Sequence, residues 1–410
     1  MTHHRLHYSY VIAAGCFGIQ AVAIGIFSSY GVLFSPLVSE FGWSRAAISG
    51  ASSVAYLLMG LVGIVVGRLN DRIGPRLLLT VTGICFGLGY LLMFRLEAVW
   101  QLYLFLGAIL GIGMSSVDVI TLTTIARWFA RKRGVATGAM KVGTGAGQMI
   151  VPLLANLLII HYGWRHACVL IGVAVLMILV AIAQLMRRDP GLMGLSPDAN
   201  KSGPVEELDS GAEGLTLGEV VRTRQFWTIC AANLSVVFCL MLVLVHIVPF
   251  AIDRQVSPTK AAGVLSAIGG VSMAGRFFSG LTLDRIGSKR VLVFCSALLV
   301  AAFLWLHQTD ELWMMYLFAV IYGIAHGGCF TALSPLVAEL FGLRAHGAVL
   351  GIVVFSGTVG GAVGPFLAGY IFDVSGGYGL ALRICVLASA LGFGLISTVK
   401  PIGVTTTGRA

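Results

Sequence analysis

Apolar runs of about 20 residues follow one another along almost the whole 410-residue chain. A helix needs about 20 apolar residues to cross the hydrocarbon core of a bilayer. Of all residues 58% are hydrophobic and only 11% are charged, whereas a soluble domain carries about 25% charged residues. Because so few polar residues cannot cover a water-facing surface, the sequence predicts an all-α integral membrane protein.

The lengths of the runs predict twelve transmembrane helices. We expect them over 8–36, 44–69, 76–95, 98–128, 132–161, 165–187, 224–252, 258–284, 289–307, 311–341, 344–373 and 378–399. The stretch 188–222 is rich in Gly, Pro, Ser and acidic residues, a composition typical of a linker. It divides the chain into two six-helix halves, 1–187 and 223–410, and a short helix from Leu215 to Val221 is possible within it.

The net charge of +10 could indicate nucleic-acid binding, but its distribution favours another explanation. With these spans, 19 of the 27 Lys and Arg residues fall on one side, 6 on the other and 2 inside the membrane. Because basic loops stay in the cytoplasm, the richer side, with both termini, is expected to be cytoplasmic. The short tails and compact linker are typical of a bacterial inner-membrane protein. We therefore expect the bilayer, and no nucleic acid, as the partner of this charge.

The eight cysteines lie singly in apolar runs and form no C-x-x-C pair. This spacing predicts buried free thiols, with neither disulfides nor a metal site. The first apolar run begins near Tyr8 and is too long for the core of a signal peptide, so we expect it to be the first span.

The two halves repeat at a constant offset of 213 residues. GRLNDRIGPR at 67–76 matches GLTLDRIGSK at 280–289. The same offset pairs Ser44 with Ser257, Gly134 with Gly347, Gly138 with Gly351 and Pro152 with Pro365. Parallel repeats of six helices are an architecture of secondary transporters.

GRLNDRIG resembles the signature loop between helices 2 and 3 of the major facilitator superfamily, and here a second copy lies between helices 8 and 9. The resemblance implies the major facilitator fold and transport by alternating access. The charged residues of the two loops would gate one side through ion pairs that break in the other conformation; otherwise they only fix topology. These gating candidates are Asp71, Arg72, Asp284 and Arg285.

A second resemblance lies in ARWFARKRGVATGAMKVGTGAG at 126–147 and YGWRHA at 162–167. These segments are similar to the helix 4 to helix 5 region, and to the start of helix 6, of monocarboxylate transporters and their oxalate/formate-type relatives. Arg276 matches an Arg that the family carries in helix 8. The chain departs from the animal members in having no Lys in helix 1, so chemistry assigned to that Lys does not carry over.

Three ionisable residues lie inside predicted spans, where a charge is costly. Asp118 is nine residues from Arg127, Lys141 is eight from Arg133, and Arg276 is eight from Asp284. At 1.5 Å per residue, all three lie roughly 12–14 Å deep, near the midplane. Transporter sites are expected at that depth.

The chemistry of these three residues favours a small organic anion and a proton as partners. The planar fork of Arg276 suits a carboxylate, unless Arg276 only staples helices together. Lys141 is either a second anion ligand, which would favour a dicarboxylate, or the ion-pair partner of Asp118. Asp118 is a candidate for proton coupling, because burial and a nearby Lys act on a carboxyl in opposite directions.

Other candidates lie on helices that would line the cavity. His246 and His326 could carry a proton, since His titrates near neutral pH, although a lone His more often only packs. The aromatic residues that could shape the substrate pocket are Tyr30, Tyr56, Tyr322 and Phe355. The glycines of GTGAG at 143–147 and GTVGGAVGP at 357–365 allow close contact between the halves, whether these move or not.

The sequence predicts a proton-coupled symporter of lactate- or pyruvate-like monocarboxylates, expected to act as a monomer without cofactors or metals. An anion exchanger of the oxalate/formate type is the alternative. A drug exporter, a channel and a non-transporting sensor are less favoured. No H-E-x-x-H, G-x-S-x-G or G-x-x-x-x-G-K-[ST] motif occurs, which argues against a membrane enzyme and an ATP-driven pump.

Overall fold

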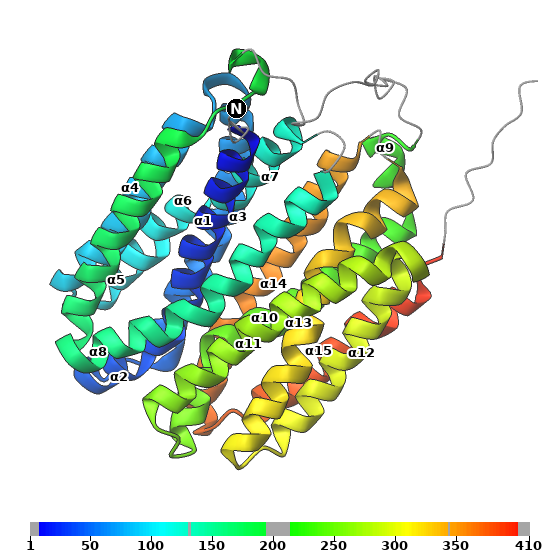
Figure 1. The fold of residues 1–410 in the computed structure, drawn as a ribbon. Helices are drawn as coiled ribbons and strands as arrows, with labels where there is room; N and C mark the ends of the chain where they lie inside the picture. The colour runs from blue at the N-terminus through cyan, green and yellow to red at the C-terminus, as the bar shows by residue number, and fades with distance from the viewer. Residues whose placement is uncertain (1–7, 130–132, 194–213, 343–344, 401–410) are drawn as a thin grey trace, which may run out of the picture.

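The computed structural model describes residues 8–129, 133–193, 214–342 and 345–400, and its regular structure there is helical (Figure 1). The exception is one isolated antiparallel bridge between Gly214 and Gly342. Eleven helices of the described chain are long and apolar enough to cross a membrane. The predicted all-α membrane fold is confirmed.

The N-terminal helices follow the predicted spans closely. They are α1 (Tyr8–Ser28), η1 (Ser29–Leu33), α2 (Phe34–Phe41), α3 (Arg45–Ile73), α4 (Pro75–Leu92), η2 (Met93–Arg95), α5 (Val99–Leu102), η3 (Tyr103–Ile109), α6 (Leu110–Met114), α7 (Val117–Trp128) and α8 (Arg133–Leu185).

Helix α8 has 53 residues and contains two of the twelve predicted spans. A straight helix of that length would measure about 80 Å, whereas the hydrocarbon core is about 30 Å thick. The chain breaks the helix at Gly163, whose φ of 76° and ψ of 156° are not helical. The two arms of α8 therefore supply the fifth and sixth spans, which the sequence predicts as separate helices.

The predicted continuous helix over 98–128 is instead a series of segments. A π-helical stretch, η3, covers Tyr103–Ile109, and α6 and α7 are separated at Ser115 and Ser116. The Ser115 hydroxyl donates to the Ile112 carbonyl at 2.6 Å, which competes with the helical ladder. The interruption lies directly before Asp118.

The C-terminal helices also match the predicted spans. They are α10 (Arg224–Asp253), α11 (Pro258–Ile286), α12 (Ser288–His307), α13 (Leu312–Phe341), α14 (His346–Ser375) and α15 (Gly379–Thr398). Between the halves, the described part of the linker contains η4 (Pro190–Met193) and α9 (Leu217–Val220), the latter within the predicted short helix. The hydroxyl of Thr216 caps α9 by accepting from the Glu219 amide.

The internal repeat appears in the backbone. Gly74 and Gly287 end α3 and α11 with φ of 83° and 84°, a region that glycine occupies without strain. Their amides donate to the carbonyls of Asn70 and Leu283. Equivalent positions of the two loops therefore make the same turn.

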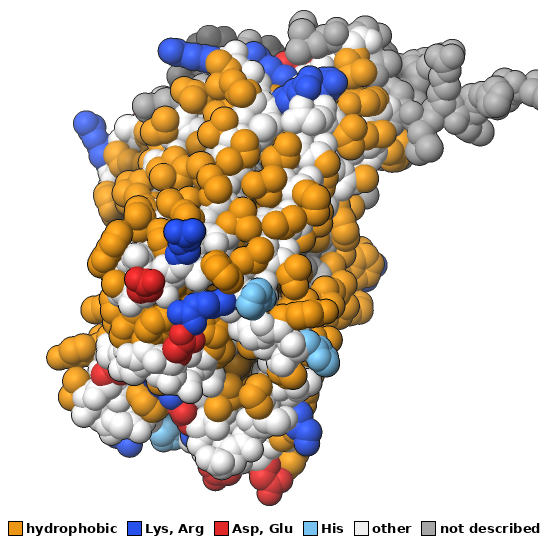
Figure 2. Space-filling view, turned by 90° about the vertical axis from the view of Figure 1, so that its left-hand side faces the viewer, with side chains coloured by type: hydrophobic (Ala, Val, Ile, Leu, Met, Phe, Trp, Pro, Cys, Tyr) orange, Lys and Arg blue, Asp and Glu red, His pale blue; other side chains and the backbone are white. Residues whose placement is uncertain are grey.

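The main contacts between the N-terminal and C-terminal helices are those of α3 with α14 and of α8 with α11, and η1 also contacts α10 (Figure 1). The outer surface is largely apolar, and Figure 2 shows a broad apolar area below a row of basic side chains at the upper edge, with further charged and His side chains from mid-height to the lower end. Leu61, Val65, Leu154, Leu387 and Leu391 are among the exposed apolar residues. Such a surface requires lipid around it. All eight cysteines are free thiols; seven are buried and Cys85 is half-buried.

Candidate functional site

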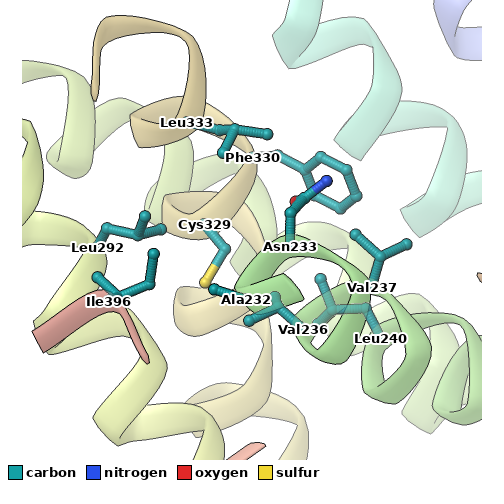
Figure 3. Close-up of a pocket in the computed structure, with 10 residues that line it drawn as sticks. All are labelled: Ala232, Asn233, Val236, Val237, Leu240, Leu292, Cys329, Phe330, Leu333 and Ile396. Atoms are coloured by element: carbon teal, nitrogen blue, oxygen red, sulfur yellow. The ribbon is translucent and has the colours of Figure 1, made fainter. Parts of the chain in front are cut away.

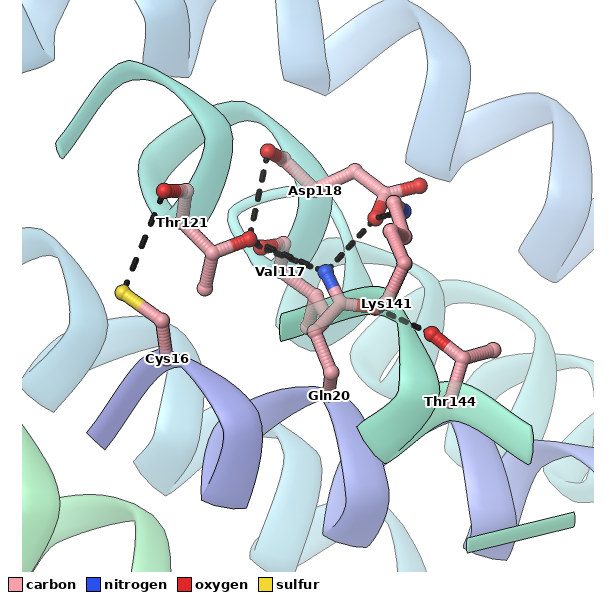
Figure 4. A network of polar contacts seen from close by, with 7 residues as sticks. All are labelled: Cys16, Gln20, Val117, Asp118, Thr121, Lys141 and Thr144. Atoms are coloured by element: carbon pink, nitrogen blue, oxygen red, sulfur yellow. Dashed lines mark hydrogen bonds and ion pairs between the residues drawn. The ribbon is translucent and has the colours of Figure 1, made fainter. Parts of the chain in front are cut away.

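The structure brings together the three membrane-embedded charges. Asp118 lies on α7 and Lys141 on the first arm of α8, and Lys141 Nζ donates to Asp118 Oδ1 at 2.5 Å (Figure 4). This contact realises the ion-pair alternative for Lys141. The pair lies directly after the interruption of the fourth span, where regular helix resumes at Val117.

Gln20 on α1 completes this network, and the sequence reasoning missed it. Gln20 is fully buried. Its Nε2 donates to Asp118 Oδ1 at 2.7 Å and to Thr121 Oγ1 at 2.9 Å, while its Oε1 accepts from Thr144 Oγ1 at 2.8 Å (Figure 4). The available signal was a single amide within an otherwise apolar run. Gln20 ties α1, α7 and α8 together around one carboxylate oxygen.

The ion pair is accessible to solvent despite its depth. The side chain of Asp118 is 54% exposed and that of Lys141 is 30% exposed. Their partner Gln20 is fully buried, so the pair lies at the edge of tightly packed helices and part of each charged side chain stays accessible.

Arg276 approaches the pair from the other half. Its Nη1 donates to Ser272 Oγ on its own helix, α11, at 3.2 Å. The guanidinium lies over Gly145 of α8, where a methyl group on that glycine would stand 3.1 Å from Nη1. Asp118 and Arg276 also interact electrostatically. Within the described residues, no carboxylate lies within 4.0 Å of the guanidinium.

His326 is a buried neighbour of Arg276. The ring is 1% exposed, stacks on Tyr322 at 5.9 Å and 20°, and its Nδ1 has no hydrogen-bond partner in the described structure. The backbone of the next residue, Gly327, packs directly on Ser272 and Arg276. His326 is thus a neighbour of the charged cluster with one unused ring nitrogen.

The aromatic candidates are less closely associated with the charges. The Tyr322 hydroxyl donates to the Leu240 carbonyl at 2.7 Å, and the Tyr30 hydroxyl donates to the Ile48 carbonyl at 2.5 Å. Both are buried. Phe355 is half-buried on α14. Tyr56 on α3 is close enough to Asp118 for an electrostatic interaction and packs against Gly361 of α14.

A second polar cluster joins the halves at the end of the bundle opposite the linker. We call it the distal latch: Arg45, Asp253, Asp373, Tyr378 and His246. Sequence reasoning selected only His246 among these residues. Charged residues at helix ends are ordinary, so the sequence carried no signal that the others meet.

Arg45, at the start of α3, is the centre of the distal latch. Its Nη2 donates to Asp253 at 2.6 Å and its Nη1 to the Tyr378 hydroxyl at 2.7 Å. The backbone amides of Arg45 and Ala46 donate to the Asp373 carboxylate at 2.8 and 2.7 Å. An acid at a helix N-terminus is favourable, and here it comes from the opposite half.

His246 contacts Tyr378 within the distal latch. Its Nδ1 lies 2.9 Å from the Tyr378 hydroxyl and its Nε2 lies 2.8 Å from the Pro365 carbonyl. Both ring nitrogens are therefore engaged, and the residue is 2% exposed. His246 thus belongs to the contacts of the distal latch rather than to the charged cluster.

The predicted gate at the linker end is described only in part. Arg72 and Arg285 are exposed on the last turns of α3 and α11. The side chains of Asp71 and Asp284 lie outside the described residues, so the predicted ion pairs of these loops stay a prediction.

A cavity inside the C-terminal half can be set aside as a substrate site. It is lined mostly by apolar side chains of α10, α12, α13 and α15 (Figure 3). Its volume is about 10 Å³, which is close to the minimum for one water molecule. The Asn233 amide at its wall already donates to the Val353 carbonyl at 2.7 Å.

The fold and this paired-half geometry define a multi-pass membrane transporter rather than an enzyme. The sequence profile of the Major Facilitator Superfamily matches residues 16–306 and 271–408. The chain belongs to this superfamily. The predicted family is confirmed.

Individual relatives agree with this assignment. Monocarboxylate transporter 13 of Rattus norvegicus is 26% identical over 394 residues, which cover 96% of this chain and 89% of that protein. Monocarboxylate transporter 11 of Homo sapiens is 27% identical over 382 residues, covering 90% and 78%. The predicted resemblance to monocarboxylate transporters is thus supported by whole-length similarity.

The solved structures support the fold. A bacterial homologue of the human lysosomal transporter Spinster, in an inward-facing and occupied conformation, superimposes with a TM-score of 0.73. The match covers 96% of this chain and 97% of that chain, at 16% sequence identity.

Proposed function

We propose that this protein is a secondary transporter of small monocarboxylates, lactate- or pyruvate-like, coupled to protons in symport. The observation that carries the proposal is Arg276, a guanidinium inside the membrane with no carboxylate partner among the described residues. An unpaired cation at this depth is costly. A substrate carboxylate would supply the missing negative charge through two parallel hydrogen bonds.

The charge balance of the cluster favours a monoanion. Lys141 and Arg276 contribute two positive charges, and Asp118 contributes one negative charge. The empty cluster therefore carries one net positive charge. One monoanion neutralises it while Asp118 is ionised, and the net charge stays unchanged when a monoanion and a proton load together. The whole-length similarity to proteins named monocarboxylate transporters supports the same substrate class.

Asp118 is the proposed proton carrier. A proton on this carboxyl would remove the charge that holds Lys141 at 2.5 Å, and solvent reaches more than half of the side chain. Loading one proton together with one monoanion is electroneutral, so the pH gradient would supply the driving force. His326, with its unpaired Nδ1 beside Arg276, is a second candidate for this proton. For His246 a structural role in the distal latch fits its two hydrogen bonds better.

We propose alternating access in which the contacts at the two ends of the bundle form and break in turn. The distal latch is closed here, and Arg45 holds Asp253 and Asp373 of the opposite half. The TM-score of 0.73 to a transporter described as inward-facing supports an inward-facing state for this chain as well. We propose that halves 1–187 and 223–410 rock about the charged cluster. Asp71, Arg72, Asp284 and Arg285 would then close the linker end when the distal latch opens.

The orientation is part of the proposal. The excess of basic residues at the linker end supports a cytoplasmic location for both termini, with the distal latch on the outer face of a bacterial inner membrane. We propose that a single chain performs the cycle, since each chain contains both halves.

A dicarboxylate exchanger of the oxalate/formate type is the second candidate, for one specific reason. With a proton on Asp118, Lys141 and Arg276 would present two unbalanced positive charges, which suits a dianion. In this case the proton stays on Asp118 and is not transported with the anion.

Uptake into proteoliposomes tests the proposal. Accumulation of radiolabelled L-lactate that depends on an inward proton gradient, with no uptake of oxalate, is the expected result. Uptake of oxalate only against internal oxalate or formate, without any effect of the gradient, would instead establish the exchanger. No flux of either anion would overturn both.

A further inference from the structure

A groove of about 580 Å³ opens on the seam between the two halves. Its walls come from α8 of the N-terminal half and from α11 and α13 of the C-terminal half. Along α11 its lining runs from Thr259 to Val271, a rise of twelve residues or about 18 Å. That length is close to half the thickness of the hydrocarbon core, so the groove covers about one leaflet at the end of the distal latch.

The lining of the groove changes from charged at its mouth to apolar at its deep end. Lys260 is exposed at the mouth, and no carboxylate lies within 4.0 Å of its amine in the described part of the chain. Six residues further in, the Ser266 hydroxyl is 3% exposed and has no hydrogen-bond partner in that same part. The deep end is apolar, lined by Met149, Leu153 and Val271.

We infer that this groove holds an anionic glycerophospholipid of the surrounding bilayer. The lipid phosphate would pair with Lys260, an ester oxygen would accept from Ser266, and an acyl chain would fill the apolar end. Lys260 and Ser266 would thereby each gain a partner. A buried hydroxyl without a partner is unfavourable, and an acyl chain alone cannot satisfy it.

The position of the groove gives the lipid a role in transport. Beside Lys260, the Asn156 amide of α8 donates to the Thr259 hydroxyl of α11 at 3.2 Å, directly across the seam. A headgroup bound here would lie next to a contact that joins the halves. The lipid would therefore stabilise the conformation in which this end of the seam is closed.

Native mass spectrometry of the full chain, offered equal amounts of phosphatidylglycerol and phosphatidylcholine, tests the inference. We expect one retained phosphatidylglycerol, preferred about tenfold, because both lipids offer a phosphate to Lys260 but the choline cation of phosphatidylcholine repels its ammonium. The preference is expected to disappear in Lys260→Gln. Ser266→Val is expected to weaken retention of both lipids. Arg383→Gln, which removes an exposed cation from α15, is the matched control and is expected to keep the preference.

Several outcomes would overturn the inference. These are equal retention of the two lipids by the wild type, an unchanged preference in Lys260→Gln, or an equal loss in Arg383→Gln, which would indicate general surface charge. A dimer that dissociates in Lys260→Gln would assign the groove to a second copy of the chain. A thermal unfolding curve for Lys260→Gln that matches the wild type shows that any loss is not a folding defect.

Discussion

Lys141 Nζ lies 2.5 Å from Asp118 Oδ1, and the same oxygen accepts from Gln20 Nε2 at 2.7 Å. One carboxylate oxygen thus holds two donors from two different helices, α8 and α1. Any event that neutralises Asp118 weakens both contacts together. This arrangement couples the charge of one side chain to the packing of three helices.

Asp118→Asn is expected to separate proton coupling from substrate movement. The amide keeps an oxygen for Gln20 but cannot take up a proton. Uptake of L-lactate driven by a proton gradient should fall by at least about tenfold, a common effect of losing a positioned proton-transfer group, while exchange of lactate across the membrane continues. The measurement is gradient-driven uptake beside equilibrium exchange in the same proteoliposomes.

The control for this variant is Asp310→Asn, which changes an exposed acid outside the site. Gradient-driven uptake that persists in Asp118→Asn would remove Asp118 from the coupling mechanism and leave His326 as the next candidate.

Gln20→Met is expected to lower stability. Gln20 is fully buried and bonds Asp118, Thr121 and Thr144. Methionine has a similar length but no amide, so partners inside the bundle lose a hydrogen bond, at about 1–3 kcal/mol. Unfolding of the purified protein in detergent measures the change. Gln308→Met, at an exposed position, serves for comparison; equal stability of the two variants would contradict the proposed network.

Arg45→Gln is expected to open the distal end. The substitution removes the ion pair with Asp253 and the stacking of the guanidinium on Phe372, 3.7 Å from the ring centroid. Spin labels at Ser39 and Ser257, both exposed and in opposite halves, report the separation by electron–electron distance measurement. A longer distance should gain population in Arg45→Gln.

Arg165→Gln provides the matched control for the latch. Arg165 pairs with Glu40 within the N-terminal helices, so its loss breaks an ion pair without freeing the halves. Identical distance distributions in Arg45→Gln and the wild type would mean that the latch does not hold this conformation.

Gly145→Ala is expected to impair transport at a point of close approach. A methyl group on Gly145 would meet the Met273 side chain and stand 3.1 Å from Arg276 Nη1. Gly138, seven residues earlier on α8, has nothing within 4 Å of such a methyl group. Uptake should therefore fall several-fold in Gly145→Ala and stay near the wild-type rate in Gly138→Ala. Equal uptake rates of the two variants would contradict a role for the close contact at Gly145 in transport.

The architecture and the three charges inside the spans could be predicted from the sequence for a common physical reason. Lipid penalises polar residues so strongly that spans and embedded charges stand out one residue at a time. Asp118, Lys141 and Arg276 were therefore found from their depth alone. The repeat at 67–76 and 280–289 added the fold.

The contacts that the sequence did not predict join residues that are far apart in the chain. Gln20 is uncharged, so the one amide in its apolar run is a weak signal and says nothing of its partners. Arg45 and Asp373 lie at helix ends, where charges meet water and carry no penalty, yet they are brought together from 328 positions apart. The interruption at Ser115 and Ser116 is also invisible to hydropathy, since small residues keep the run apolar.

The central claim is that Arg276 binds the substrate carboxylate, and proton-driven uptake of L-lactate by Arg276→Gln and Arg276→Lys measures it most directly. Glutamine keeps the length but loses the charge, while lysine keeps the charge but loses the fork. Uptake should fall by at least about tenfold in Arg276→Gln and partly recover in Arg276→Lys, with both variants folded as judged by their unfolding curves. Wild-type uptake in Arg276→Gln would contradict the account.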